Sequence, residues 1–517
     1  MSFSRSTQLP ILKWSAVTRI TNLLRTNDFV VACLLTLLCM VTRVLAIPAS
    51  LWEWDDILFA RALHRFDLIA HSPHPPGFPV FVLLTRGVFW ILHDEHRALV
   101  IAAFTFSSFL TGVLFYFYRQ IFKDRQIAIA GALLGSFIPN VWIYSCAGRS
   151  DAPALVLGIL ASTLVLHGLK SRRSLLIGCA LLGLGMGVRV TILFVVAPML
   201  AMVLLIRLSS REWRLILQAL SIIAFCILIW YLPMIWHQTW RTYSSVVANH
   251  RNYIWRTDSM FAPNGNSILS YRFIRYYNDV WGAQWIRDLT YALAAVGVLV
   301  LAIQRRWQTL GWMAVGFLPY MCFSFAITAP MASPLYSLPY MPLFTGLAAY
   351  GAIKFPRLLS TKLSNSGLVF MTALTICVAG WTYPIIKMMH HRVSPSLSAI
   401  HYLQQTLDPE HDLLIYDGVF SPHVSLYLSR FRTILRSESK PARTTRPDHS
   451  AGDLNLVYLT ESPLSQLSIQ HFSWEEERGA RRLWRLSLGR YFDAYITRVP
   501  KEMAEFEMSE EEAKAIK

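Results

Sequence analysis

Apolar runs recur along the chain from about residue 28 to residue 389, and short polar segments separate them. An α-helix needs roughly 20 consecutive apolar residues to cross a bilayer core of about 30 Å. The pattern therefore predicts about eleven membrane-spanning helices. They cover residues 28–47, 97–118, 126–146, 151–168, 174–188, 190–206, 214–236, 288–304, 307–328, 336–353 and 366–388.

One further apolar stretch, residues 77–92, is short for a crossing, because roughly 16 residues reach only about 24 Å as a helix. Lys and Arg mark the cytoplasmic ends of membrane helices. If 77–92 does not cross, the N-terminus and every basic cluster fall on one side. The clusters are Arg119/Lys123/Arg125, Lys170/Arg172/Arg173, Arg207/Arg211/Arg214, Arg305/Arg306 and Lys354/Arg357/Lys362. We therefore expect a cytoplasmic segment over 1–27 and a helix over 77–92 that lies along or dips into the outer leaflet.

This topology leaves three extracytoplasmic pieces, namely the loops 48–96 and 237–287 and the tail 390–517. The loop 237–287 is rich in aromatic and Arg residues, which is typical of a segment at the membrane interface, and a purely structural interfacial loop is one reading of it. In the tail, strand-like runs at 412–416 and 454–458 alternate with helix-like stretches. The fold class is therefore an all-α polytopic membrane helix bundle over 28–389, with a small extracytoplasmic soluble α/β domain over 390–517.

Composition supports this class. The chain of 517 residues is 54% hydrophobic and 15% charged, whereas a soluble chain carries about 25% charged residues. Its 48 Lys and Arg against 31 Asp and Glu give +17. Because these basic residues lie in short clusters between apolar runs, they indicate topology and contact with membrane lipid, and no nucleic acid partner is expected.

Three acids follow the first span, in Leu51-Trp-Glu-Trp-Asp-Asp56, which places Glu53, Asp55 and Asp56 at the outer membrane surface. Carboxylates at that depth are costly unless they are paired or used. One reading is an interfacial ion pair with Arg61 or Arg65. The other is a general base that takes a proton from an acceptor hydroxyl.

A proline corner, His71-Ser-Pro-His-Pro-Pro-Gly-Phe-Pro79, comes next. Consecutive prolines fix the backbone and exclude helix from the residue before them. The corner is either a helix entrance or a support that holds His74, and with it His71, towards the acids. No cofactor is required by the pattern, and a divalent metal held by residues such as Glu53 and His71 is left open.

These two motifs together resemble those of the GT-C membrane glycosyltransferases, which include protein O-mannosyltransferases and lipid A aminoarabinose transferases. The likeness rests on Trp54-Asp-Asp-x-x-x-Ala60 just past the first span and on His74-Pro-Pro-Gly77 before an apolar helix. It implies a polytopic helix bundle and a polyprenyl-phosphate-linked sugar as donor. Asp55 matches the first acid of the family, the catalytic base, and Asp56 stands where many members have Glu. His74 matches the family's His-Pro-Pro.

Three further residues fit this resemblance. Gly148-Arg-Ser-Asp151 opens the span at 151 on the outer face, where relatives have a second acidic position, so that Arg149 and Asp151 become candidates. The alternative is an ordinary N-cap by Ser150 or Asp151. Arg189 falls at an outer turn, where it either binds the donor phosphate or snorkels at a helix end. The stretch around Tyr336 lacks the Arg that precedes the Tyr in many members.

The sequence thus predicts a glycosyltransferase of the plasma (inner) membrane that works on the extracytoplasmic face. Its donor is a polyprenyl-phosphate-linked hexose or pentose, and its acceptor is a hydroxyl of a lipid, glycan or protein. A lipid or sugar-lipid transporter or flippase is the main alternative, and a catalytically silent protein that presents the tail is another. A transporter is expected to carry charges midway along its spans, whereas here they cluster at one surface.

Overall fold

The structure is a computed structural model. It describes residues 27–263, 265–360, 365–436, 442–445, 455–464, 470–474, 478–487, 493–499 and 505–508. The segment 1–26, for which we predict a cytoplasmic location, lies outside these residues.

Helices occupy the predicted spans, singly or as consecutive pairs. They are α2 (Asp28–Val44), α5 (Glu95–Ser107), α6 (Leu110–Phe122), α7 (Arg125–Phe137), α8 (Pro139–Tyr144), α9 (Asp151–His167), α10 (Arg172–Val188), α11 (Leu193–Ser209), α12 (Trp213–Gln238), α15 (Gln284–Ile303), α16 (Trp307–Ile327), α18 (Met341–Leu359) and α19 (Ser366–His391). Six helical stretches of the described residues are long and apolar enough to cross a bilayer. The chain is an integral membrane protein, and a total of about eleven spans stays a prediction.

The surface of α12 shows what surrounds the bundle. Phe225, Leu228, Leu232 and Trp236 are exposed on it, Trp236 to 90%. Large apolar side chains in such a continuous row are unfavourable in water and favourable against lipid tails. The row therefore fits a helix that faces the hydrocarbon core.

Glycines set the tightest helix contact of the bundle, between α15 and α18. A Cβ atom on Gly297 would lie 2.1 Å from the carbonyl oxygen of Leu347, and one on Gly351 would lie 2.2 Å from that of Leu293. Small residues allow membrane helices to approach this closely. On α10 the glycines near Arg189 act in the same way, since a Cβ on Gly187 would lie 2.3 Å from Val80.

The predicted span 336–353 begins later than expected. Residues 333–340 form two short turns, α17 (Ser333–Tyr336) and the 3-10 turn Leu338–Tyr340, and α18 begins only at Met341. Pro334, Pro339 and Pro342 explain this start, because proline lacks the N–H that a helix interior needs and is tolerated in a first turn. The consequence is an irregular segment that brings Tyr336 to the candidate site.

The two short helices after the first span lie against each other. Helix α3 (Trp54–His64) carries the acids, and α4 (Pro79–Leu92) is the predicted helix over 77–92. Arg86 on α4 donates two hydrogen bonds to the carbonyl oxygen of Ala62 on α3, at 3.1 and 2.7 Å. Arg86 thus joins the two helices.

The tail contains a mixed sheet. Its strands are β1 (Asp412–Tyr416), β2 (Arg432–Leu435), β4 (Asn455–Thr460), β5 (Gln470–Phe472) and β6 (Ala494–Val499), in the order β2-β1-β4-β6-β5, and β3 (Ala442–Thr445) pairs with β7 (Glu505–Met508). β1 runs parallel to β2 and β4, with Leu414 opposite Val457, while β6 is antiparallel to β4 and β5. Helices α20 (Pro395–Thr406) and α21 (Ser421–Tyr427) pack beside the sheet, whereas α22 (Arg478–Ser487) packs against α19 of the bundle. The α/β character predicted for the tail is confirmed.

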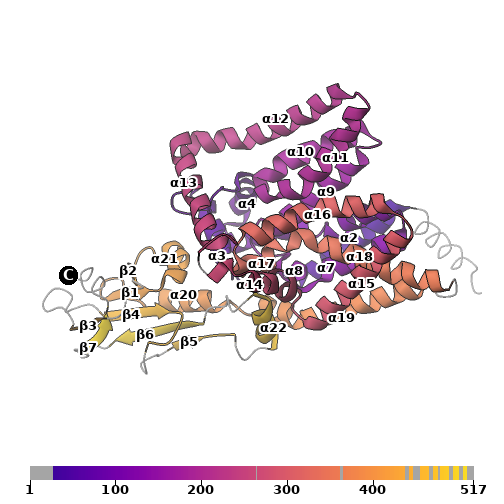
Figure 1. The fold of residues 1–517 in the computed structure, drawn as a ribbon. Helices are drawn as coiled ribbons and strands as arrows, with labels where there is room; N and C mark the ends of the chain where they lie inside the picture. The colour runs from indigo at the N-terminus through magenta and orange to yellow at the C-terminus, as the bar shows by residue number, and fades with distance from the viewer. Residues whose placement is uncertain are drawn as a thin grey trace, which may run out of the picture.

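The sheet region adjoins the end of the bundle that carries α3 (Figure 1). Ser394 joins the two parts, since its N–H donates to Ser50 Oγ at 2.8 Å and its hydroxyl donates to the carbonyl oxygen of Leu51 at 2.9 Å. Leu426 and Tyr427 of α21 pack against the apolar cluster that contains α3 and α4. The helix with the acids is therefore supported from both parts of the molecule.

Candidate active site

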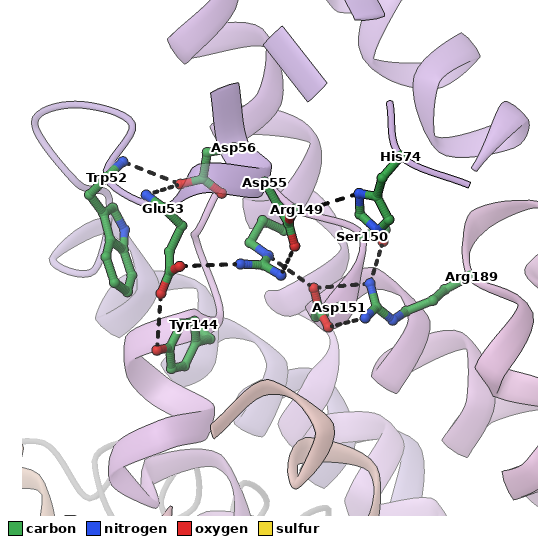
Figure 2. A network of polar contacts seen from close by, with 10 residues as sticks. All are labelled: Trp52, Glu53, Asp55, Asp56, His74, Tyr144, Arg149, Ser150, Asp151 and Arg189. Carbon is green, nitrogen blue, oxygen red and sulfur yellow. Dashed lines mark hydrogen bonds and ion pairs between the residues drawn. The ribbon is translucent and has the colours of Figure 1, made fainter. Parts of the chain in front are cut away.

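Arg149, in the turn between α8 and α9, lies at the centre of a buried ionic network (Figure 2). Its Nη2 is 2.5 Å from Asp55 Oδ2, its Nε is 3.2 Å from Asp151 Oδ2, and its Nη1 is 3.6 Å from Glu53 Oε2. Its side chain is only 4% exposed. Burial opposes the charged form, but the carboxylates of Asp55, Asp151 and Glu53 outweigh it and hold the pKa of Arg149 well above its ordinary value. Glu53 and Asp55 thus pair with Arg149, while Arg65 pairs with Asp67.

Asp151 connects this centre to Arg189. Arg189 follows α10, and its Nη2 lies 3.1 Å from Asp151 Oδ1. Its Nη1 donates to the hydroxyl of Ser150 at 3.1 Å. Ser150 occupies the N-cap position of α9, yet its side chain does not cap the helix. The side chain of Arg189 is 7% exposed, so the reading of a snorkelling arginine is wrong.

Aromatic rings surround the guanidinium of Arg189. Its Cζ lies 5.3 Å from the ring centroid of Tyr336 and 5.6 Å from that of Phe78. Cation–π contacts of this kind strengthen when water is excluded. The stretch around Tyr336 has no Arg of its own, and Arg189 reaches it from α10.

His74 is held close to Asp55 by the proline corner. Its Nδ1 lies 3.8 Å from Asp55 Oδ1, which is too long for a hydrogen bond. Its ring packs edge-on against Phe78, with centroids 4.8 Å apart, and against Phe59. Burial lowers the pKa of His74 to about 4, so the ring is neutral at pH 7. His71, by contrast, is exposed.

Asp56 points away from the other acids of α3. Its Oδ2 accepts the backbone N–H groups of Trp52 and Glu53 at 3.3 and 3.2 Å, and so caps the first turn of the helix. The side chain is fully buried, and this burial raises the pKa of Asp56 to about 7. Neighbouring acids on one helix therefore have different environments, since Asp55 is 28% exposed and Asp56 is not exposed at all.

The acids and histidines do not fit a divalent metal. Within the described part of the chain, no three His, Cys, Asp or Glu side chains converge as metal ligands. His64 pairs with Glu95 at 2.7 Å, and Glu53 and Asp55 face the guanidinium of Arg149. A cation placed among these carboxylates would be repelled by Arg149.

Two residues at the site, Tyr144 and His250, have no signal in the sequence that singles them out, and a third, Tyr336, is marked only by its stretch. The hydroxyl of Tyr144 donates to Glu53 Oε1 at 3.4 Å. His250, from α13 (Trp240–Tyr253), faces His74 with ring centroids 6.3 Å apart. Tyr336 lies in a stretch that the resemblance points to, but its contact with Arg189 depends on the fold. Apart from these, the structure brings together the predicted Glu53, Asp55, His74, Arg149, Asp151 and Arg189.

A small pocket lies beside Asp151 and Arg189. Its remaining lining is largely apolar and comes from α9, the turn after Arg189, α11, α16 and the segment before α18. These residues are Ala154, Leu155, Gly158, Ile159, Thr191, Ile192, Val195, Tyr320, Leu335 and Pro339. The pocket therefore combines one ionic end, at Asp151 and Arg189, with an apolar wall.

One family model matches part of the chain. Residues 73–237 match the family model of dolichyl-phosphate-mannose-protein mannosyltransferases. The matched segment contains His74, Arg149, Asp151 and Arg189, and it begins after Asp55. A comparison with curated proteins by sequence finds no match.

Among solved structures, ArnT from Cupriavidus metallidurans in the apo state is similar, with 12% identity, a TM-score of 0.50 and coverage of 91% of this chain and 98% of that chain. ArnT of the same organism bound to undecaprenyl phosphate shows 13% identity, a TM-score of 0.48 and coverage of 95% and 98%. The Archaeoglobus fulgidus oligosaccharyltransferase in complex with Zn and sulfate shows 10% identity, a TM-score of 0.45 and coverage of 82% and 67%. The predicted resemblance to GT-C membrane glycosyltransferases is confirmed, and the fold is of the GT-C type.

Proposed function

We propose that the chain is a glycosyltransferase that moves a sugar from a polyprenyl-phosphate donor to a hydroxyl of a lipid, glycan or protein, with Asp55 as general base. One observation carries the assignment of the base. Asp55 is 28% exposed, whereas the side chains of Glu53, Arg149, Asp151 and Arg189 are 4–7% exposed. A base must reach the proton that it removes. Within this network, Asp55 is the carboxylate that a substrate can reach.

The ion pair with Arg149 prepares Asp55 for this role. Arg149 Nη2 lies 2.5 Å from Asp55 Oδ2 and leaves Oδ1 of the same carboxylate on the side of His74. The buried Arg149 also fixes the position of the carboxylate through its further contacts with Asp151 and Glu53. A base held in this way is oriented before the substrate arrives.

The proposed reaction is a single displacement. Asp55 takes the proton of the acceptor hydroxyl, and the hydroxyl oxygen forms a bond to the anomeric carbon of the donor sugar. The bond from that carbon to the phosphate oxygen breaks, and its electron pair leaves with the polyprenyl phosphate. Because attack and departure occur on opposite faces, the anomeric configuration inverts. The positive charge of Arg189 would stabilise the departing phosphate.

The pocket beside Arg189 supports a donor of this chemistry. A guanidinium binds phosphate through charge-assisted hydrogen bonds, and the apolar lining from α9 and α11 would suit the first part of a polyprenyl chain. The matched family model is named after enzymes that use dolichyl-phosphate mannose, which is a polyprenyl-phosphate sugar. The transferred sugar is a hexose or a pentose in this proposal.

The orientation of the site is also part of the proposal. With 77–92 outside, all basic clusters face the cytoplasm, and α3, the turn after α10 and the tail 390–517 face outwards. The protein is then placed in the plasma (inner) membrane with a cytoplasmic N-terminus. A reporter that is active only outside the cytoplasm, fused after residue 390, is expected to be active. A cytoplasmic signal from that fusion would reject the outward-facing site.

Transfer itself is tested with the purified chain in detergent. A panel of polyprenyl-phosphate sugars is incubated with a membrane extract from cells that lack the chain, and the release of free polyprenyl phosphate is measured. Mass spectrometry of surface glycans, lipids and glycoproteins from cells with and without the chain identifies the acceptor. If no donor of the panel is cleaved and reconstituted vesicles move intact sugar-lipid across the bilayer, the transporter alternative replaces this proposal.

A further inference from the structure

Helix α13 lies beside the candidate site, and none of its residues is buried. It is nevertheless fixed at both ends. Just before it, Gln238 Nε2 donates to the carbonyl oxygen of Phe66 at 3.1 Å. After it, Arg272 Nη1 donates to the carbonyl oxygen of Asp258 at 2.7 Å. Figure 1 shows α13 running from the end of α12 towards α3. The helix therefore holds a defined position although it contributes nothing to a core.

One side chain of α13 faces the reacting groups. His250 lies with its ring centroid 6.3 Å from that of His74. Burial, followed by the charge of His71, lowers the pKa of His250, and Asp55 opposes this shift. His74 in turn lies with its Nδ1 3.8 Å from Asp55 Oδ1, so the ring of His74 stands between His250 and the proposed base. Among the residues that the structure describes, no group hydrogen-bonds to its imidazole.

The groups around Asp55 leave the side next to α13 for the acceptor. Arg149 lies on the buried side of Asp55 and binds its Oδ2, and His74 Nδ1 lies 3.8 Å from its Oδ1. Arg189, with the pocket, provides the charged and apolar surface that suits the donor. The hydroxyl that Asp55 deprotonates has to come within about 2.6–3.2 Å of it. His250 can hydrogen-bond and faces the ring of His74 beside Asp55, which places it to hold that hydroxyl.

We propose that His250 binds the acceptor hydroxyl beside Asp55, so that α13 forms the acceptor side of the site. This inference rests on the proposed glycosyltransferase function. A neutral imidazole has one donor and one acceptor nitrogen, and either can pair with an alcohol. The ligand class is therefore an uncharged hydroxyl group, such as one on a sugar, and the rest of the acceptor lies along α13.

The test separates the two substrates kinetically. The full chain in detergent is assayed for release of polyprenyl phosphate, first with the membrane extract varied at saturating donor, then with the donor varied at saturating extract. His250→Ala is expected to raise the half-saturating amount of extract about two- to tenfold, the worth of one hydrogen bond, and to leave that of the donor unchanged. His250→Gln, which can still hydrogen-bond, should recover part of the loss.

Asn249→Ala provides the matched control, because Asn249 is the exposed neighbour of His250 on the same helix. It should leave both half-saturation values unchanged. If His250→Ala raises the half-saturating donor concentration as much as the half-saturating amount of extract, His250 contacts the donor and the proposal is overturned. An unchanged extract dependence also overturns it. If the wild-type chain releases no polyprenyl phosphate from any donor, the glycosyltransferase function itself fails, which is a distinct result.

Discussion

Replacing Asp55 by Asn tests the central chemical assignment, because the amide keeps the size of the carboxylate and cannot accept a proton at neutral pH. General base catalysis contributes about 10²–10⁴-fold to a rate, which corresponds to roughly 3–5 kcal/mol of barrier. We expect Asp55→Asn to lower turnover by about that factor. The half-saturating donor concentration should change little, because the pocket beside Arg189 stays intact.

The same substitution also affects the fold, and the two effects must be separated. The contact between Asp55 Oδ2 and Arg149 Nη2, at 2.5 Å, is a charge-assisted hydrogen bond, and such a bond contributes about 1.5–3 kcal/mol. The loss should stay at the lower end of that range, because the Asn carbonyl can still accept from Arg149. Asp151 and Glu53 also continue to neutralise the guanidinium. Most of the variant should therefore remain folded.

The assay measures release of polyprenyl phosphate together with thermal unfolding and elution of the detergent-solubilised protein. Asp288→Asn is the control, since Asp288 is 55% exposed and pairs only with the adjacent Arg287 among the described residues. It makes the same chemical change far from the network and should leave both measurements unchanged. Turnover of Asp55→Asn within a few fold of wild type, in a folded sample, would refute the base and leave Asp55 as a structural ion-pair partner.

Further changes should separate donor binding, helix capping and packing. Arg189→Ala should weaken donor binding roughly ten- to a hundredfold, because a hydrogen bond to a charged group contributes about 1.5–3 kcal/mol. Arg189→Lys should recover part of the lost affinity. Titration of the donor with each variant measures both effects. The pKa of Asp56 in the folded protein, about 7, is raised above the ordinary 3.8, so the folded state holds a proton that the unfolded state has lost between these pH values. The contribution of Asp56 to the stability of the fold therefore falls as the pH rises from 3.8 to 7. Asp56→Asn should therefore raise the melting temperature at pH 8 relative to wild type more than at pH 5, with turnover nearly unchanged. Gly297→Ala should lower the melting temperature and the yield of folded protein, because the new methyl would meet the Leu347 carbonyl, whereas Gly311→Ala, with open space around it, should not.

The helices of the bundle could be predicted because the length of an apolar run is a local property. A run of about 20 residues is sufficient to indicate a span whatever packs against it. The exception is the stretch 336–353, where the predicted start disagrees with the structure. The residues there remain apolar, which predicts a helix, but Pro339 and Pro342 are excluded from a regular helix interior. Hydropathy and backbone geometry therefore predict different starts for this helix. Reading the prolines before the hydropathy would have placed the start nearer Met341.

The ionic residues of the site could be predicted one by one, but their pairing could not. Charged groups at a membrane surface are costly unless they are used, which marks Asp55, and the resemblance to the GT-C enzymes marks Asp151 and Arg189. The partner of Asp55 is 94 positions away, in the turn before α9. Local spacing favours Arg61 or Arg65 as the ion-pair partner of Asp55. Only the packing of α3 against that turn makes Arg149 the partner.

Asp151 shows why the pairing matters for the chemistry. Its Oδ2 faces Arg149 Nε at 3.2 Å and its Oδ1 faces Arg189 Nη2 at 3.1 Å, so one carboxylate separates two buried guanidinium groups. Without it the two cations would repel each other in a site of low dielectric constant. With it, Arg149 remains available to orient Asp55, while Arg189 is held between Tyr336 and Phe78 at the mouth of the pocket. The base and the group proposed to receive the departing phosphate are thereby kept apart yet rigidly connected, as a displacement with attack and departure on opposite faces requires.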